Sequence, residues 1–134
     1  MVGFDGSKKE GWAMEFGKKI RELRKKKGLS QRELAQLVGI DFTYLSKIET
    51  GDLPPPSDEV IAKLAQYLGA DEEELFLLAK KIPPQYRREI LEDKAVPDIL
   101  RLVTTYPEFR EELEAFVREW KARRQGQRSG LQKG

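Results

Sequence analysis

The 134-residue chain is long enough for a small domain with an additional segment, and its charged fraction of 36% and net charge of +2 suit a helix-rich protein. It contains no Cys and no His, which excludes disulfides and thiolate metal sites and removes the usual general base at neutral pH. No apolar run approaches the roughly 20 residues that span a bilayer, and no signal-peptide core is present. We therefore expect a cytoplasmic protein that is not an enzyme and that needs no metal or cofactor.

The first predicted helix follows a segment without apolar periodicity. Residues 1–11 are rich in Gly and charge, so we expect a flexible N-terminal arm. Phe16, Ile20 and Leu23 then recur at helical spacing, and Gly28 can end this helix in the left-handed conformation.

The second and third helices have strong start signals. Ser30 can cap a helix that begins at Gln31, and Glu33 three residues later completes a capping box. Gly39 permits a sharp turn, and Asp41 can cap a third helix from Phe42 to about residue 48, before Gly51. This pattern predicts two short helices joined by a tight turn.

Two more helices complete the predicted first domain. The loop Asp52-Leu53-Pro54-Pro55-Pro56 cannot continue a helix, whereas Ser57 can cap a fourth one and Asp71 a fifth. Pro83-Pro84 then interrupts the chain. We therefore predict a five-helix domain over residues 12–82.

The remaining residues predict a small helical region over 83–122 with a disordered basic tail over 123–134. Helices are expected near residues 86–91 and 96–103, followed by a strong helix from Pro107. Apolar side chains at helical spacing form a stripe on this last helix: Phe109, Leu113, Phe116, Val117 and Trp120. The stripe could pair with the same stripe of a second subunit or pack on the helices before it, and both arrangements can coexist.

Charge is distributed unevenly along the chain. Residues 12–51 carry nine basic and five acidic side chains, residues 52–79 carry one basic and seven acidic, and residues 121–134 carry five basic and none acidic. A basic block followed by an acidic one suggests that one face of the first domain meets a polyanion. The alternative is that these are solvated helix faces.

Residues 31–50 meet several packing requirements of a helix-turn-helix together. Two helices that cross closely need a small residue, here Ala35, and a permissive backbone at the turn, here Gly39. The apolar seam against the other helices would consist of Leu34, Val38, Ile40, Leu45 and Ile48.

Through LSQRELAQLVGI, YLSKIETG and IAKLAQYLGA, the sequence resembles the lambda-repressor-like (Cro/cI, XRE) family of helix-turn-helix transcriptional regulators over about residues 14–80. The resemblance implies a compact five-helix DNA-binding domain. Together with the helices expected after residue 83, which would form a small C-terminal helical dimerisation or regulatory region, it gives an all-α fold. Its third helix would enter the major groove, and the start of its second would touch the backbone.

The resemblance also implies roles for individual residues. Phe42, Thr43 and Lys47 match positions that read base edges, and Arg24 and Glu49 match a structural ion pair. Positions that contact the DNA backbone are matched or adjoined by Ser30, Gln31, Arg32, Tyr44 and Thr50. One departure is Asp52 after Gly51, where many relatives carry Lys or Arg, and this weakens backbone contact there.

The aromatic and basic residues of the third helix could also have less specific roles. Phe42 could pack within the domain, and Tyr44 could be a core or rim aromatic. Lys47 can donate to guanine, and Thr43 and Phe42 can contact a thymine methyl, but Lys47 could instead contact only phosphate.

The function expected from these observations is sequence-specific binding of double-stranded DNA, as a homodimeric repressor on a pseudo-palindromic operator, associated with the nucleoid when bound. The C-terminal region could also receive a regulatory protein or ligand. Alternatives are an antitoxin or phage-type regulator, or an adaptor that binds protein with the same fold. An enzyme is the weakest alternative, since no His, Cys or phosphate-binding Gly loop is present.

Overall fold

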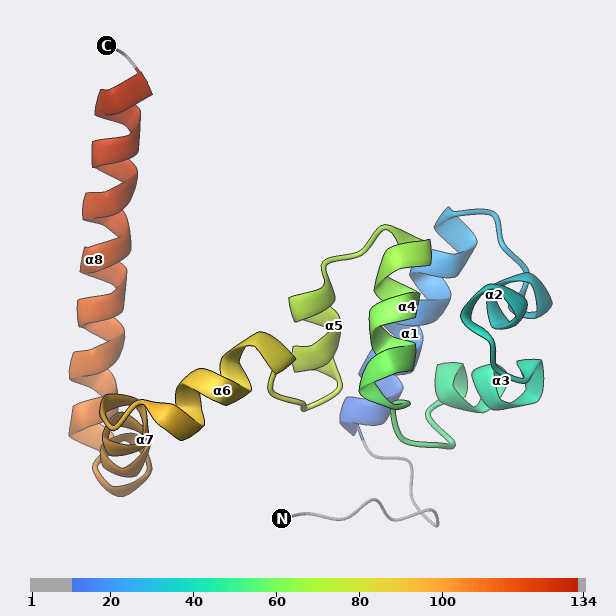
Figure 1. Cartoon of the computed structure of the whole chain (residues 1–134), viewed down its shortest axis with the longest axis horizontal. Coiled ribbons are helices and arrows are strands. Elements are labelled where there is room, and N and C mark those ends of the chain that lie inside the picture. Colours follow the sequence, from blue (N-terminus) through green and yellow to red (C-terminus); the bar gives the residue numbers. More distant parts are fainter. Residues whose placement is uncertain (1–10, 133–134) are drawn as a thin grey trace. The chain divides into compact units, whose positions relative to one another are not determined.

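The computed structural model describes residues 11–132, and within this range it contains eight helices and no strands. In chain order they are α1 (Gly11–Lys26), α2 (Gln31–Val38), α3 (Phe42–Thr50), α4 (Asp58–Leu68), α5 (Glu72–Leu78), α6 (Pro84–Glu92), α7 (Ala95–Thr105) and α8 (Pro107–Gln132) (Figure 1). The all-α prediction is confirmed. The arm expected over residues 1–11 lies outside the described residues except for Gly11, which already belongs to α1.

The chain divides into two compact units after Pro84, two residues beyond the boundary we placed after Ile82. Packing explains the difference, because the Pro83 side chain is fully buried. The Lys81 ammonium also ties this segment back to the start of α4, since it donates to the Pro56 carbonyl at 2.9 Å and to the Asp58 carboxylate at 3.1 Å. The segment before α6 therefore belongs to the first unit.

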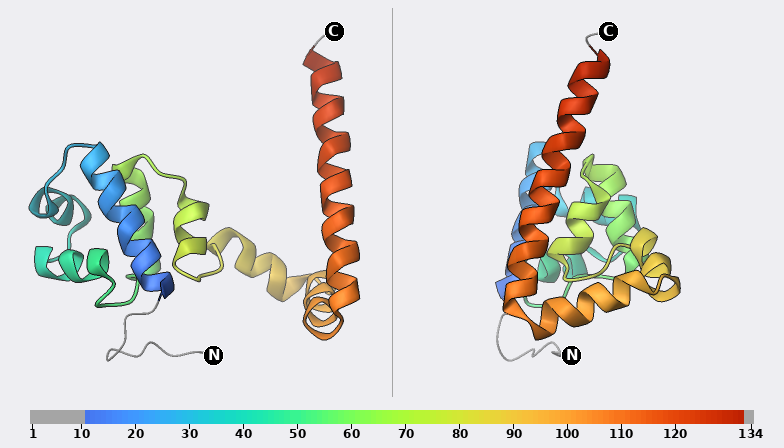
Figure 2. Two further views of the ribbon diagram at one scale, coloured as in Figure 1. Left: turned by 180° about the vertical axis from the view of Figure 1, so that it is seen from behind. Right: turned by 90° about the vertical axis from the view of Figure 1, so that its left-hand side faces the viewer.

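The first unit is built from α1 to α5 around one apolar core. Figures 1 and 2 show α1 and α4 side by side, with α2 and α3 on one side of them and α5 on the other. Its largest fully buried hydrophobic side chains from these helices are Phe16, Ile20, Leu34, Val38, Leu45, Ile48, Ile61, Leu64, Leu75 and Phe76. Burying each such side chain contributes roughly 1.5–3 kcal/mol. The expected seam is present, with Ile40 half-buried at its edge.

The second unit contains α7 and α8 packed against each other. None of the residues of α6 or α7 is buried, and the α8 side chains described through residue 127 are half-buried or exposed. Within the described residues, no helix is both long and apolar enough to cross a bilayer. A unit that hides so little of its apolar surface has little core of its own.

The disordered tail that we expected over residues 123–134 is helical as far as Gln132, so this expectation was wrong for the described residues. Continuing an existing helix avoids the cost of nucleation. Arg and Gln, which dominate the start of this segment, are also good helix formers. The basic segment therefore extends α8.

Candidate nucleic-acid interface

Capping side chains fix the start of α2 and the start of α3. The Ser30 hydroxyl accepts the Glu33 N–H at 3.0 Å, while the Glu33 carboxylate accepts the Ser30 N–H at 3.3 Å, which completes the predicted capping box. Gly39 then turns the chain with a φ of 77°, a left-handed conformation that glycine adopts at little cost. Asp41 begins α3 by accepting the Thr43 N–H at 2.7 Å.

The fully exposed Asp41 carboxylate is held in its ionised form by the helix that it caps. The hydrogen bond from the Thr43 backbone lowers the pKa of Asp41 most, followed by the one from the Thr43 side chain. An anion at a helix N-terminus is also favoured by the helix dipole. Asp41 is therefore charged at neutral pH and stabilises the first turn of α3.

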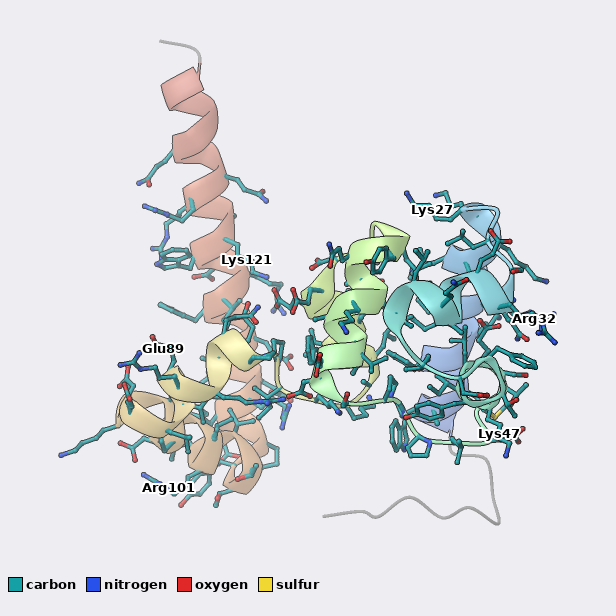
Figure 3. The ribbon with its side chains drawn as sticks, turned by 45° about the vertical axis from the view of Figure 1, so that its right-hand side comes forward. Lys27, Arg32, Lys47, Glu89, Arg101 and Lys121 are labelled. Atoms are coloured by element: carbon teal, nitrogen blue, oxygen red, sulfur yellow. The ribbon has the colours of Figure 1, made fainter. Side chains whose placement is uncertain are left out.

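The three side chains expected to read bases are all exposed on α3: Phe42, Thr43 and Lys47. At 3.6 residues per turn they span roughly 140° of the helix surface, so one groove could contact all three. Phe42 is 38% exposed rather than packed inside the domain. Figure 3 shows Lys47 projecting from the same side of the unit as Arg32.

The residues expected to contact the DNA backbone differ in exposure. Ser30, Arg32 and Thr50 are exposed, and Gln31 is half-buried. Although Ser30 accepts a hydrogen bond as a cap, its hydroxyl proton can still be donated. Tyr44 is half-buried and packs against the core, so it stands at the rim of the domain.

A buried ion pair joins α1 to α3. Arg24 donates to Glu49 through two nitrogens, Nε to Oε2 at 2.8 Å and Nη2 to Oε1 at 3.0 Å. Its Nη1 donates to the Leu29 carbonyl at 2.9 Å, just before α2. Gln31 Nε2 donates to the same Glu49 carboxylate at 3.1 Å. This network fixes the start of α2 relative to α3. A surface on which a duplex could rest requires such a fixed arrangement.

A separate contact joins the first turn of α2 to the first residue of α3, and it comes from Arg32. The Arg32 guanidinium lies over the Phe42 ring, with Cζ 4.2 Å from the ring centroid. Sequence reasoning missed this contact because the two residues lie on different helices and no spacing rule relates them. The only signal was that both occur in the first turn of their helices, on either side of the tight turn.

Comparisons with known proteins match the part of the chain that contains α2 and α3. A family model for the helix-turn-helix matches residues 20–75. The chain is 31% identical over 112 residues to the HTH-type transcriptional regulator SinR of Bacillus licheniformis, and the match covers 82% of this chain and 97% of that protein. This chain belongs to the helix-turn-helix family of transcriptional regulators. The family resemblance inferred from the sequence is therefore confirmed.

Solved structures of other regulators are similar to this helix-turn-helix regulator in part. The restriction-modification controller protein C.AhdI of Aeromonas hydrophila is 44% identical, covers 48% of this chain and 96% of its own, and has a TM-score of 0.44. The SinR–SinI complex gives 26% identity, covers 80% of this chain and 97% of its own, and has a TM-score of 0.46. The regulator also matches glutamine–fructose-6-phosphate aminotransferase of Methanocaldococcus jannaschii at 37% identity, over 42% of this chain and only 5% of that enzyme's length.

The end of α3 in the regulator carries an acidic group at the candidate interface. Thr50 donates its hydroxyl proton to the Asp52 carboxylate at 2.7 Å, with the Lys47 carbonyl at 3.2 Å as a second acceptor. A hydroxyl has a single proton, so Thr50 must give up these acceptors to donate to a phosphate. Asp52, noted above as a departure from the family pattern, therefore both engages the Thr50 hydroxyl and adds negative charge here. This edge of the domain is less suited to a polyanion than the start of α2.

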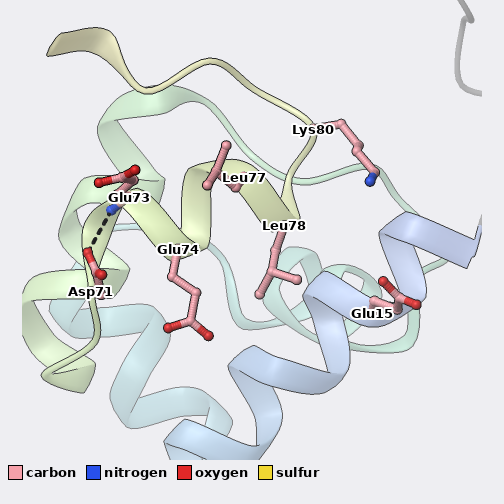
Figure 4. Close-up of a pocket in the computed structure, with 7 residues that line it drawn as sticks. All are labelled: Glu15, Asp71, Glu73, Glu74, Leu77, Leu78 and Lys80. Atoms are coloured by element: carbon pink, nitrogen blue, oxygen red, sulfur yellow. Dashed lines mark hydrogen bonds between the residues drawn. The ribbon is translucent and has the colours of Figure 1, made fainter. Parts of the chain in front are cut away.

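Acidic side chains of the regulator gather on α5 and the facing part of α1. An open pocket there is lined by Glu15, Asp71, Glu73, Glu74, Leu77, Leu78 and Lys80 (Figure 4). The dashed contact in the figure is the Asp71 cap, which accepts the Glu73 N–H at 3.0 Å. This charge distribution disfavours nucleic acid at α5 and leaves the start of α2 and α3 as the candidate interface.

Proposed function

We propose that this regulator binds a specific double-stranded DNA operator through α3, and that it acts as a homodimeric repressor on two inverted half-sites. The observation that carries the proposal is the exposure of Phe42, Thr43 and Lys47 on one side of α3, beside the exposed Ser30 and Arg32 of the α2 entry. A helix that presents a Lys, a hydroxyl and an apolar ring suits the donor, acceptor and methyl pattern of the major groove.

The C-terminal unit supports the homodimer. Phe116, Val117 and Trp120 on α8 are 56%, 39% and 48% exposed, which is unusual for large apolar side chains that lie on one stripe. Phe109 and Leu113, further back on the same stripe, are half-buried. A second copy of α8 would cover this stripe, and its twofold symmetry would match an inverted repeat.

Selection of bound sequences from random duplex DNA with the full chain tests the proposal. We expect a motif with two inverted half-sites whose centres lie about 34 Å apart along the duplex, and an affinity that falls steeply with added salt because bound counterions are released. Selection of no motif would contradict sequence-specific binding, and a single asymmetric half-site would contradict the dimer.

A matched variant assigns the role of Lys47 within the same selection. Lys47→Ala should remove the preference at one base pair per half-site, worth about 1–3 kcal/mol, if Lys47 reads a base. An equal loss of affinity for all sequences would place Lys47 on a phosphate instead. Repression requires a separate measurement, a reporter gene with the selected operator placed across its promoter, where expression should fall when the regulator is present.

A further inference from the structure

Arg32 and Phe42 form a stacked pair at the tip of the helix-turn-helix. The guanidinium Cζ lies 4.2 Å from the ring centroid, and both residues are exposed. Arg32 comes from the first turn of α2, which would follow the DNA backbone, whereas Phe42 is the first residue of α3, which would enter the groove. The stack therefore draws a cationic side chain of α2 toward the base-reading end of α3.

A face-to-face contact of the Arg32 guanidinium with the Phe42 ring would leave the hydrogen-bonding edge of Arg32 free. A guanidinium that stacks on a ring uses its face, while its N–H groups point outward in the plane. Such a contact stabilises an exposed pair only modestly. It also limits the rotamers of the long Arg32 side chain, and ordering this side chain would otherwise oppose DNA binding. In such a contact Arg32 could present two parallel donors to a base.

The two side chains lie close enough together to reach neighbouring base pairs. The Arg32 Cζ is 4.2 Å from the Phe42 ring centroid, and successive base pairs are about 3.4 Å apart along the duplex. Two donors in a fork match guanine O6 and N7, and an aromatic ring makes apolar contact with a thymine methyl. The two stacked side chains could therefore address adjacent base pairs in the major groove.

We propose that Arg32 is a specificity-determining residue that reads a guanine, and that Phe42 positions its guanidinium while contacting the thymine of the adjacent base pair. The inference rests on the proposed DNA-binding function and adds a reader from α2 to those of α3. It differs from the expectation drawn from the family resemblance, in which Arg32 belongs with the residues that contact the DNA backbone.

Selections from random duplex DNA with full-length variants test this inference. The variants are Arg32→Ala, Arg32→Lys, Phe42→Leu and Phe42→Trp, with Arg21→Ala as a control that removes an exposed arginine from α1. We expect the wild-type motif to contain a guanine next to a thymine. Arg32→Ala should reduce the preference for that guanine by about ten-fold or more, since it removes the bidentate contact that gives this discrimination. Arg32→Lys keeps donors for the guanine but lacks the planar fork that stacks on the ring, so it should reduce the preference less than Arg32→Ala does.

The Phe42 variants separate positioning from direct contact. Phe42→Leu keeps an apolar contact for the thymine but lacks a ring face, so the preference for guanine should fall several-fold although Arg32 is intact. Phe42→Trp retains a face for stacking and should keep the guanine preference. Arg21→Ala should leave the motif unchanged. Circular dichroism melting curves of all variants check that the fold is intact.

Distinct results would overturn the inference. If Arg32→Ala leaves the motif unchanged and lowers affinity equally for all sequences, Arg32 contacts phosphate. If Phe42→Leu alters only the thymine position, Phe42 does not position Arg32. If the wild-type chain selects no motif, the proposed function itself fails and the inference fails with it, which is a different result from a wild-type motif that survives in the Arg32 variants.

Discussion

Gly17 of α1 lies directly against the backbone of Ile48 at the end of α3. A Cβ atom built on Gly17 would stand 2.2 Å from the Ile48 carbonyl oxygen and 2.5 Å from that of Glu49. Both neighbours are backbone atoms that cannot rotate away, so the two helices could not keep this separation with any larger residue. The absence of a side chain at Gly17 thus sets how closely α1 supports the recognition helix.

Gly17→Ala should therefore destabilise the first unit although alanine favours helices. Overpacking costs about 1–3 kcal/mol, which exceeds the roughly 1 kcal/mol gained from helix propensity. Urea unfolding followed by circular dichroism measures the change. Gly11→Ala is the matched control, because a Cβ at Gly11 meets nothing within 4 Å. A Gly17→Ala protein as stable as the wild type would show that α1 and α3 can separate at little cost.

The sequence predicts the parts of the fold that depend on local signals. Ser30, Asp41 and Ser57 were expected to cap helices, and each accepts a backbone N–H in the structure. Gly39 was expected at the turn and has a positive φ. These features depend on residues within a few positions of one another, so spacing alone reveals them.

The parts that the sequence did not predict depend on distant residues or on chain continuity. The closeness of Gly17 to Ile48 and the stacking of Arg32 on Phe42 join different helices, and no local pattern encodes them. The Arg24–Glu49 pair could be expected only from family resemblance. The helical tail does not follow from its composition alone, because residues 123–132 continue α8 and do not start a helix of their own.

Replacing one partner of the Arg24–Glu49 pair should be costly. The Glu49 side chain is 1% exposed, so Arg24→Met would leave a buried carboxylate without its cation, at a cost of about 3–5 kcal/mol. The double variant Arg24→Met, Glu49→Leu removes both charges and should recover much of the lost stability, because no buried charge remains. Urea unfolding compares the three proteins. If the double variant is less stable than Arg24→Met, the ion pair stabilises the unit by more than the neutralisation of its two buried charges.

The Asp41 cap predicts a pH dependence of stability. Its pKa is lowered in the folded state, chiefly by the Thr43 backbone hydrogen bond, so the folded state favours the ionised form. The stabilisation is complete above the ordinary pKa of an aspartate and is lost as the pH falls through the lowered value. Asp41→Asn retains a capping side chain without the titrating charge.

We therefore expect the wild type to exceed Asp41→Asn in stability at neutral pH, and this difference to shrink in the acid range below the ordinary aspartate pKa. Urea unfolding of both proteins across that range measures it. Asp71→Asn, a cap on α5, tests whether the effect is particular to Asp41. A difference that does not change with pH would contradict the assignment of the lowered pKa.

Neutralising Asp52 should strengthen DNA binding. Its carboxylate accepts the Thr50 hydroxyl at the end of α3, where it adds negative charge near the proposed phosphate contacts. Asp52→Asn should raise operator affinity by up to about five-fold, since a charge interaction in water is worth about 1 kcal/mol at 4 Å. Binding titrations at low and high salt measure this, and the gain should shrink as salt screens the charge.

Glu72→Gln provides the control for Asp52→Asn, because it removes one exposed negative charge from α5, away from α3. If both variants gain equally, net charge explains the effect. If Asp52→Asn loses affinity instead, the carboxylate holds Thr50 in a conformation that binding requires.

The α8 stripe should carry the homodimer if the proposed architecture is correct. Phe116 is 56% exposed, and a fully buried Phe contributes up to about 3 kcal/mol. Because a twofold interface would contain two copies, Phe116→Glu should raise the dimer dissociation constant by about 100-fold or more. Gln125→Glu makes the same charge change on the opposite side of α8, about 180° away at 100° per residue, and should leave the dimer intact. Sedimentation equilibrium of the three full-length proteins decides the matter: a monomeric wild type, or a Phe116→Glu chain that dimerises normally, would mean that this stripe does not join two copies.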